Sequence, residues 1–479
     1  MDPDTGAGLL HRLTSYSPDR EWDEPADDTR VRHDLTPNDP ATRPPIAKEY
    51  GHGLPVVALS RDLPRPGTSA TAALAGAPVA ALPLDAAQLG RVLFLGAGVV
   101  RTTERNGVLW RFRAAGSAGA RFPLELYAST KGVDGVPDGV HWYDPVAHAL
   151  VQVGPAAEGA ATTLVVTGVP WRTGWRYAER GWRHLYWDGG TLVAHLLAAA
   201  GSAGLEPRLR TRFPDAAVRA LVGADGVHEY PLALLTLGDG DPALAATGPA
   251  AVGSLPPVEF PLCTAAQAAG ESEELGPPWA AGASLGHVPA SAPLDEVVLR
   301  RGSQRLMDRT ATLPREHLEW PLLAALRGID IPHWVVVHGV DGVPPGVYRC
   351  DDLATPLRPG DLRDELLRVC LGQYLGAEAA YVVIGAVPPA GLDDRGYREA
   401  QLAAGIVEGR LHLAAYALGA TASGMTFLDS EVPALLGEEP DLVTLLFTCV
   451  GVGAYTSRPG GGPGAPVAVR PVNAKVVED

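Results

Sequence analysis

The feature that most constrains the fold is a repeat within the chain. The segment GVDGVPDGV at residues 132–140 recurs as GVDGVPPGV at residues 339–347, with eight of nine residues identical at an offset of 207. Two further matches follow in the same order: Arg180 to Arg183 with Arg395 to Arg398 at an offset of 215, and apolar runs ending at Gly238 and Gly451 at an offset of 213. Chance similarity of short, low-complexity strings is the alternative, and the near-identical nonamer argues against it. Ordered matches at a nearly constant offset indicate an internal duplication.

Each half of the repeat shows the same succession of patterns. A helical pattern is followed by two strands around the nonamer, a third strand, a long alanine-rich helix, a short helix and a last strand; 122–127, for example, alternates like a strand. This order predicts an α+β fold, with an antiparallel sheet flanked by helices in each half. Two copies in one chain predict two tandem halves that form an intramolecular pseudo-dimer, a fused version of a two-fold homodimer.

The same patterns set the expected domain boundaries. Residues 1–80 contain the clusters TPNDPATRPP and SRDLPRPGTS, and because proline opposes long helices we expect a proline-rich N-terminal extension that wraps around the body. The first half spans 81–250, a linker spans 251–290, the second half spans 291–465, and a C-terminal tail spans 466–479.

Composition excludes several classes of partner. The chain of 479 residues has 39 basic and 55 acidic side chains, a net charge of −16, which argues against a broad surface for nucleic acid or anionic membrane. The four cysteines have no metal-ligand spacing and indicate a reduced, cytoplasmic protein. No secretion signal and no apolar segment long enough to cross a bilayer is evident in the sequence. Any anion site must therefore be local.

One such local site is predicted at residues 300–305, RRGSQR, where three guanidiniums and a hydroxyl follow an apolar-periodic run. Arginine presents a planar fork of donors that matches phosphate geometry, and a helix terminus can add to the same site. A solvated basic turn is the alternative for this stretch taken by itself.

The first half resembles the SagB-type azoline dehydrogenase branch of the FMN-dependent nitroreductase-like family. The resemblance rests on GSAGARFPLELY at 116–127, GVHWYD at 139–144, WRYAERGWR at 175–183 and DGG at 188–190. The second half resembles the same family more weakly, mainly through RGSQR at 301–305, which is similar to the family's R-R-S-x-R. The resemblance implies nitroreductase-like halves, FMN as cofactor and no metal.

The two halves depart from the family pattern in complementary ways. The first half lacks the arginine motif, and the second half lacks the P-S-A-G-A motif, reading LLAALRGIDIP instead. Because the family builds each FMN site across the dimer interface, the resemblance implies one intact site in this chain. Its phosphate ligands would be Arg301, Ser303 and Arg305, with Arg458 as a further basic ligand. Its flavin-lining residues would be Ser117, Ala118, Gly119 and Ala120.

The proton-handling Lys-Tyr pair of the resembling family reads Arg176-Tyr177 here. Arginine stays protonated and cannot act as a base, so Tyr177 becomes the candidate base, with the Arg176 cation expected to favour its phenolate. A purely structural tyrosine is the alternative. Arg180 and Arg183 are expected to face either the flavin or a salt bridge within their own half, and His184 and His195 to be packing residues.

The resemblance implies a dehydrogenase that oxidises thiazoline or oxazoline rings in a ribosomally made precursor peptide. Its partners would be that peptide, cyclodehydratase proteins and molecular oxygen as electron acceptor, with no nucleic acid and no membrane. Two alternatives stay open: an NAD(P)H-dependent flavin or nitro reductase acting on small molecules, and a degenerate, non-catalytic peptide-binding scaffold. Pairing of two pseudo-dimers into a homodimer is also open.

Overall fold

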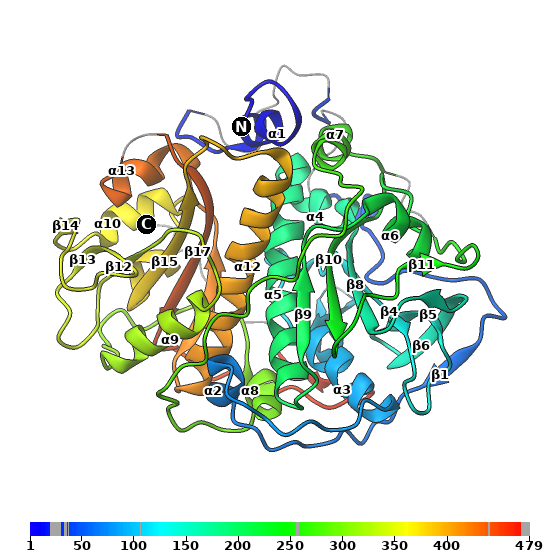
Figure 1. Cartoon of the computed structure of the whole chain (residues 1–479). Helices are drawn as coiled ribbons and strands as arrows, with labels where there is room; N and C mark the ends of the chain where they lie inside the picture. Colours follow the sequence, from blue (N-terminus) through cyan, green and yellow to red (C-terminus); the bar gives the residue numbers. More distant parts are fainter. Residues whose placement is uncertain are drawn as a thin grey trace.

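The computed structural model shows two sheets on either side of two long, adjacent helices (Figure 1). It describes residues 1–19, 30–32, 36, 38–105, 107–254, 258–438 and 441–470. Within these ranges, no helix combines the length and the apolar character needed to span a membrane. The α+β class and the antiparallel sheets predicted from the sequence are confirmed.

The first half contains a seven-stranded antiparallel sheet in the order β1-β6-β5-β4-β8-β10-β9. The first copy of the repeated nonamer joins β4 (Leu124–Thr130) to β5 (Gly139–Asp144), as the turn pattern predicts. The other strands are β1 (Val56–Ala58), β6 (Ala149–Gly154), β8 (Thr162–Gly168), β9 (Pro207–Arg210) and β10 (Tyr230–Leu237).

The second half contains a six-stranded antiparallel sheet in the order β14-β13-β12-β15-β17-β16. The second nonamer joins β12 (His333–Val337) to β13 (Gly346–Arg349). When β12 is matched with β4 and β13 with β5, the order of this sheet repeats β6-β5-β4-β8-β10-β9 of the first, strand for strand. The remaining strands are β14 (Arg358–Pro359), β15 (Tyr381–Val387), β16 (Thr421–Met425) and β17 (Val443–Gly451).

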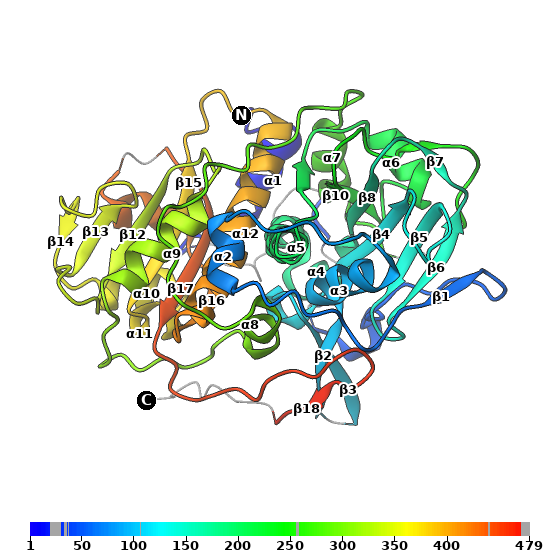
Figure 2. The same cartoon turned by 60° about the horizontal axis from the view of Figure 1, so that its bottom comes forward.

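The two long helices, α5 (Gly181–Gly201) and α12 (Asp394–Ala417), pack against each other at the centre; Figure 2 views α5 nearly end-on between the sheets. Their backbones approach closely because glycine occupies the contact points. A Cβ on Gly190 would overlap the carbonyl oxygen of Leu402, and a Cβ on Gly405 would overlap that of Trp187. The DGG motif is thus explained by close helix packing.

Ion pairs join the halves at one end of these helices. Arg180 and Arg183 both bind the carboxylate of Asp429, at 2.7 and 2.6 Å. Asp429 begins a 3₁₀ turn (Asp429–Glu431) of the second half, and all three side chains are buried. The two arginines are therefore structural, but their bridge crosses between the halves, whereas the sequence suggested a bridge within one half.

The reciprocal arrangement lies at the corresponding end of α12. Arg395 and Arg398 of the second half bind Asp215 of the first half, at 2.6 and 3.2 Å, and all three are again buried. Asp215 begins α6 (Asp215–Val222). This approximate two-fold relationship is the packing expected of a pseudo-dimer.

The N-terminal extension and the linker are more structured than the sequence suggested. Helix α1 (Gly6–Thr14) buries Leu9 and Leu10 and packs against α7 (Pro261–Ala269), which lies in the expected linker. Strand β1 of the extension pairs with β6 at the sheet edge. Helix α2 (Ala70–Ala75) packs on the central helices. These described parts of both segments therefore belong to the folded body.

A small three-stranded sheet projects below the first half in Figure 2. It consists of β2 (Val99–Arg105), β3 (Val108–Arg113) and β18 (Val467–Ala468), so the C-terminal segment reaches back to the first half. The remaining elements are α3 (Ala86–Ala97), α4 (Pro170–Tyr177), α8 (Leu294–Arg300), α9 (Glu316–Leu326), α10 (Arg363–Val369), α11 (Leu375–Glu378), α13 (Val432–Leu436), β7 (Ala157–Glu158), β11 (Ala245–Ala246) and the 3₁₀ turns Pro40–Thr42, Ala118–Ala120 and Ala178–Arg180.

Candidate functional site

The candidate site is built on the loop of residues 116–120, between β3 and β4. Asp188 of α5 fixes this loop, because its carboxylate accepts a 2.5 Å hydrogen bond from the Ser117 hydroxyl and a 3.0 Å bond from the Ala118 N–H. The Ser117 oxygen in turn accepts from the Phe122 N–H at 2.8 Å. The loop is thereby held in one conformation by a buried acid.

The backbone of this loop is strained. Gly119 has a φ of 56°, which glycine adopts readily, but Ala120 and Phe122 also have positive φ values of 54° and 48°. Non-glycine residues in this region cost about 1–3 kcal/mol each and cluster at functional sites. Gly119 is also required sterically, since a Cβ there would lie 2.7 Å from the hydroxyl oxygen of Tyr177.

Arg301 from the second half docks onto the same loop. It is buried directly after α8, and its Nη1 lies 3.2 Å from the position that a Cβ on Gly116 would take. Its Nε donates to the Ala114 carbonyl at 3.0 Å, and its Nη1 donates to Nδ1 of His412 at 3.1 Å. The structure therefore brings the second half's arginine to the first half's loop, although nearly 190 residues separate them (301 − 114 = 187).

A buried arginine of the first half links the backbones of two predicted phosphate ligands, Arg301 and Arg458. The Arg101 guanidinium, buried on the first half's β2, donates to the carbonyl oxygens of Arg301 at 2.9 Å and Arg458 at 2.8 Å. Ser303, Arg305 and Arg458 have exposed side chains. Arg458 donates to the Ala468 carbonyl at 3.2 Å, and the Arg305 side chain has no partner among the described residues. Sequence reasoning missed Arg101, which carries no motif signal.

The chemistry of these side chains suits a phosphate group. The exposed guanidiniums of Arg305 and Arg458 offer charge-assisted donors, and the Ser303 hydroxyl offers a neutral one. A Cβ on Gly302 would lie 3.5 Å from the Ser457 hydroxyl oxygen. Buried Arg301 supplies positive charge beneath them, with burial lowering its pKa to about 10, still far above neutrality.

Tyr177 ends α4 on the other side of the loop. Its ring stacks on His184 with centroids 4.1 Å apart, and its hydroxyl lies against Gly119. Burial raises the pKa of Tyr177 above its usual value, and the opposing charge of Arg176 does not overcome it. The expected stabilisation of the phenolate is therefore outweighed, and Tyr177 presents a protonated hydroxyl at neutral pH. Arg176 is exposed and donates to Oδ1 of Asn38 at 3.2 Å.

Two carboxylates, the buried Asp188 of α5 and the partly buried Glu408 of α12, lie on the central helices near the loop. Burial raises the pKa of Asp188 to about 7, against the lowering effect of its bonds from Ser117 and Ala118. Burial and then the nearby Asp188 raise the pKa of Glu408 to about 8, with Arg301 opposing them. Such groups exchange protons near neutral pH. The signal for Asp188 was present in the sequence, as a lone acid within the apolar run HLYWDGGTLVAHLL.

The corresponding place in the second half is occupied by the chain itself. The nonamer offset of 207 places Arg327 opposite Ala120, the last residue of the first half's loop. The Arg327 guanidinium donates to the carbonyls of Leu74 at 3.3 Å and Gly282 at 3.2 Å. A Cβ on Gly76 would lie 2.7 Å from it. An internal cation thus fills the mirror position.

The two histidines on α5 are packing residues. His195 Nδ1 lies 3.0 Å from the Leu95 carbonyl, and burial lowers its pKa to about 3. His184 is buried beneath Tyr177, where burial and nearby arginines lower its pKa well below the usual value. In the described part of the chain, no three His, Cys, Asp or Glu side chains are grouped to hold a metal ion.

Comparison with known proteins supports the same architecture. No family model matches the chain. A protein of Methanocaldococcus jannaschii described as a nitroreductase is 30% identical over 171 residues, covering 33% of this chain and 81% of the relative. A structure from Anabaena variabilis described as a nitroreductase aligns with 94% of this chain and 99% of its own, with a TM-score of 0.71 and 20% identity. The NADPH:FMN oxidoreductase of Vibrio harveyi, solved with NAD+, aligns with 35% of this chain and 72% of its own at 16% identity and a TM-score of 0.27, which is too low to add support.

The Anabaena structure shares the fold across both halves, and the Methanocaldococcus relative provides the sequence relationship. The chain belongs to the nitroreductase family of oxidoreductases.

Proposed function

We propose that this protein is an FMN-dependent dehydrogenase with a single flavin site, which oxidises azoline rings of a peptide to azoles. The observation that supports the proposal most is the meeting of Arg301, the loop 116–120 and Tyr177 around one place, since these three features come from distant segments. The finer assignment to azolines rests on the SagB-type resemblance of residues 116–127 and 175–183.

In this proposal the second half holds the phosphate and the first half lines the ring. Ser303, Arg305 and Arg458 present exposed donors, and Arg301 adds charge from beneath. The backbone of Ser117, Ala118, Gly119 and Ala120 lines the ring. FMN supplies the hydride acceptor for the oxidation when it is bound.

The chain's own residues would handle the proton that the azoline loses. Tyr177 cannot accept it while its own hydroxyl is protonated, so Tyr177 would donate a hydrogen bond that orients the substrate. The Ser117 hydroxyl already donates to Asp188. Ser117 would take the substrate proton as it passes its own proton to Asp188, whose pKa of about 7 lets it act as acceptor at neutral pH. One proton moves along this path, and no charge is left on Ser117.

The second candidate is an NAD(P)H-dependent reductase of small molecules, with the same flavin site. The description of the Methanocaldococcus relative as a nitroreductase favours it. A third reading, a non-catalytic scaffold, is disfavoured by the charged donors that remain around Arg301.

The visible spectrum of the purified protein tests flavin binding, and absence of a flavin band would contradict both enzyme candidates. An azoline-containing peptide incubated with the flavoprotein in air should then lose the mass of two hydrogen atoms per oxidised ring. NADH-driven reduction of a nitro compound, with the peptide unchanged, would instead select the reductase.

A further inference from the structure

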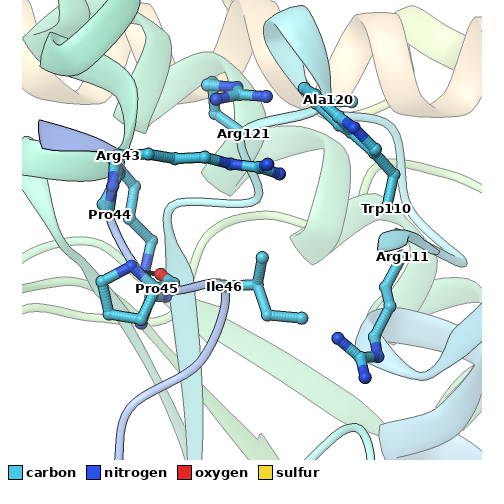
Figure 3. Close-up of a pocket in the computed structure, with 9 residues that line it drawn as sticks. Arg43, Pro44, Pro45, Ile46, Trp110, Arg111, Ala120 and Arg121 are labelled. Atoms are coloured by element: carbon cyan, nitrogen blue, oxygen red, sulfur yellow. Dashed lines mark hydrogen bonds between the residues drawn. The ribbon is translucent and has the colours of Figure 1, made fainter. Parts of the chain in front are cut away.

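A strongly cationic pocket adjoins the loop 116–120 at Ala120 (Figure 3). The pocket is small and open to solvent. The residues that matter for its chemistry are Arg43, Trp110, Arg111, Ala120, Arg121 and Arg172. Among the residues that the structure describes, no acidic side chain lines it.

Three of the four guanidiniums have no counter-charge among the described residues. Arg172 is neutralised by a buried ion pair with Glu125 at 2.5 Å. Arg43, Arg111 and Arg121, by contrast, have no carboxylate partner in the described part of the chain. Within a protein of net charge −16, this local concentration of positive charge is an anion site rather than part of a generally basic surface.

Arg121 makes the strongest case, because only 7% of it is exposed. Its Nε donates to the Gly119 carbonyl at 3.0 Å. Burial, together with the neighbouring cations Arg176 and Arg43, lowers its pKa to about 10, so it keeps its charge at neutral pH. A buried cation without a counter-ion is costly, and a bound anion would offset that cost.

Trp110 holds the arginines in place. The Arg43 and Arg121 guanidinium carbons lie 4.3 and 4.8 Å from the centroid of its ring, and Figure 3 shows both side chains directed towards it. Cation–π contacts of this kind fix the guanidiniums without using their N–H donors. Apart from the Arg121 Nε, which donates to Gly119, no hydrogen bond between these two guanidiniums and another described residue uses those donors, and they can serve a ligand.

The pocket adjoins the candidate active site. Ala120 belongs to both, and Arg121 follows the loop directly and bonds to its Gly119 carbonyl. Resting on the proposed oxidoreductase function, we propose that this pocket binds an anionic group, a carboxylate or a phosphate, carried by the substrate that reacts beside the loop. The two sources are an acidic residue or carboxyl terminus of a peptide, and the phosphates of a nicotinamide nucleotide.

Calorimetric titration of the full chain with inorganic pyrophosphate and with succinate, at low ionic strength, tests the pocket directly. Arg43→Gln and Arg111→Gln should each weaken binding about fivefold to tenfold, as expected for loss of a charge-assisted hydrogen bond. Arg65→Gln is the control, since Arg65 is exposed and does not line the pocket. Equal affinities in all four proteins, or no saturable binding, would overturn the assignment.

Kinetics separates the two sources. If the anion belongs to a peptide, Arg111→Gln should raise KM for a peptide with a free carboxylate about tenfold and leave KM for its amide unchanged. If it belongs to a nucleotide, KM for NADPH should rise instead, with kcat and FMN content unaltered. No change in KM for any anionic substrate would refute a role in substrate binding. The titration needs no flavin. It therefore tests anion binding in the pocket even if the protein proves not to bind FMN, so the two proposals can fail separately.

Discussion

Asp215 and Asp429 play the same part in opposite halves of the molecule, since each accepts two arginines from the central helix region of the other half. Both carboxylates are buried, and burial would raise the pKa of Asp429 were it not for Arg180 and Arg183, which lower it to about 2. The two clusters hold the halves together at two places, at the beginning of α6 and at the beginning of the Asp429–Glu431 turn. They give the arginines of both motifs a structural role.

We expect Asp429→Ala to destabilise the protein by about 3–5 kcal/mol, because it leaves two buried guanidiniums without a counter-charge. Urea denaturation measures the change. Glu319→Ala is the control, since the exposed pair of Arg315 with Glu319 should contribute only about 0.3–0.5 kcal/mol. A loss for Asp429→Ala no larger than that of the control would show that the cluster is not a lock.

We expect one FMN per chain, because Arg327 fills the place that corresponds to the complete site. Flavin absorbance of the purified protein, divided by protein concentration, measures the ratio. A value close to two would refute the single-site arrangement.

We expect Arg305→Gln to weaken FMN binding about tenfold, since it removes one charge-assisted phosphate contact. Its exposed side chain has no partner among the described residues, so thermal stability should not change. Fluorescence titration of the apoprotein with FMN measures the affinity, and Arg315→Gln serves as an exposed control. Unchanged affinity for Arg305→Gln would remove this residue from the site.

We expect Tyr177→Phe to lower kcat about a hundredfold with FMN still bound, as for loss of a positioned donor in the transition state. Because burial raises the pKa of Tyr177, the wild-type rate should show no gain from a phenolate between pH 7 and about 9. Steady-state kinetics across this range gives both results. Full turnover by the variant would leave Tyr177 with a packing role only.

We expect Asp188→Asn to alter the pH dependence of both the activity and the free energy of unfolding. In the wild type, kcat/KM should rise as Asp188 loses its proton near pH 7, and the variant should lack this limb. The pKa is raised in the folded state, so the folded protein binds more protons than the unfolded chain between about pH 4 and 7. Wild-type stability should therefore fall with rising pH relative to the variant, by at most about 1.4 kcal/mol per pH unit.

Urea denaturation of both proteins at several pH values measures that slope. Ser117→Ala is the matched variant for the activity arm: it removes the proton path but leaves the carboxylate. Parallel pH profiles for wild type and Asp188→Asn would refute a titrating role for Asp188.

Much of this fold follows from sequence alone. The repeated nonamer located a hairpin turn in each half, and the apolar alternation after residue 122 located β4, because these signals are local and depend on turn chemistry and side-chain period. The sequence did not predict helix α1 or the folded part of the linker. Their stability comes from packing on each other and on the body rather than from a local pattern.

The site divides in the same way. The sequence by itself determined which residue types could bind phosphate, and that each half lacked what the other had. Only the tertiary structure decided that Arg301 reaches Gly116, that burial keeps Tyr177 protonated, and that Asp188 and Glu408 titrate near neutrality. The physical reason is that pKa values and contacts between distant segments depend on burial and on neighbours brought together by the packing of α5 against α12, which no single segment specifies.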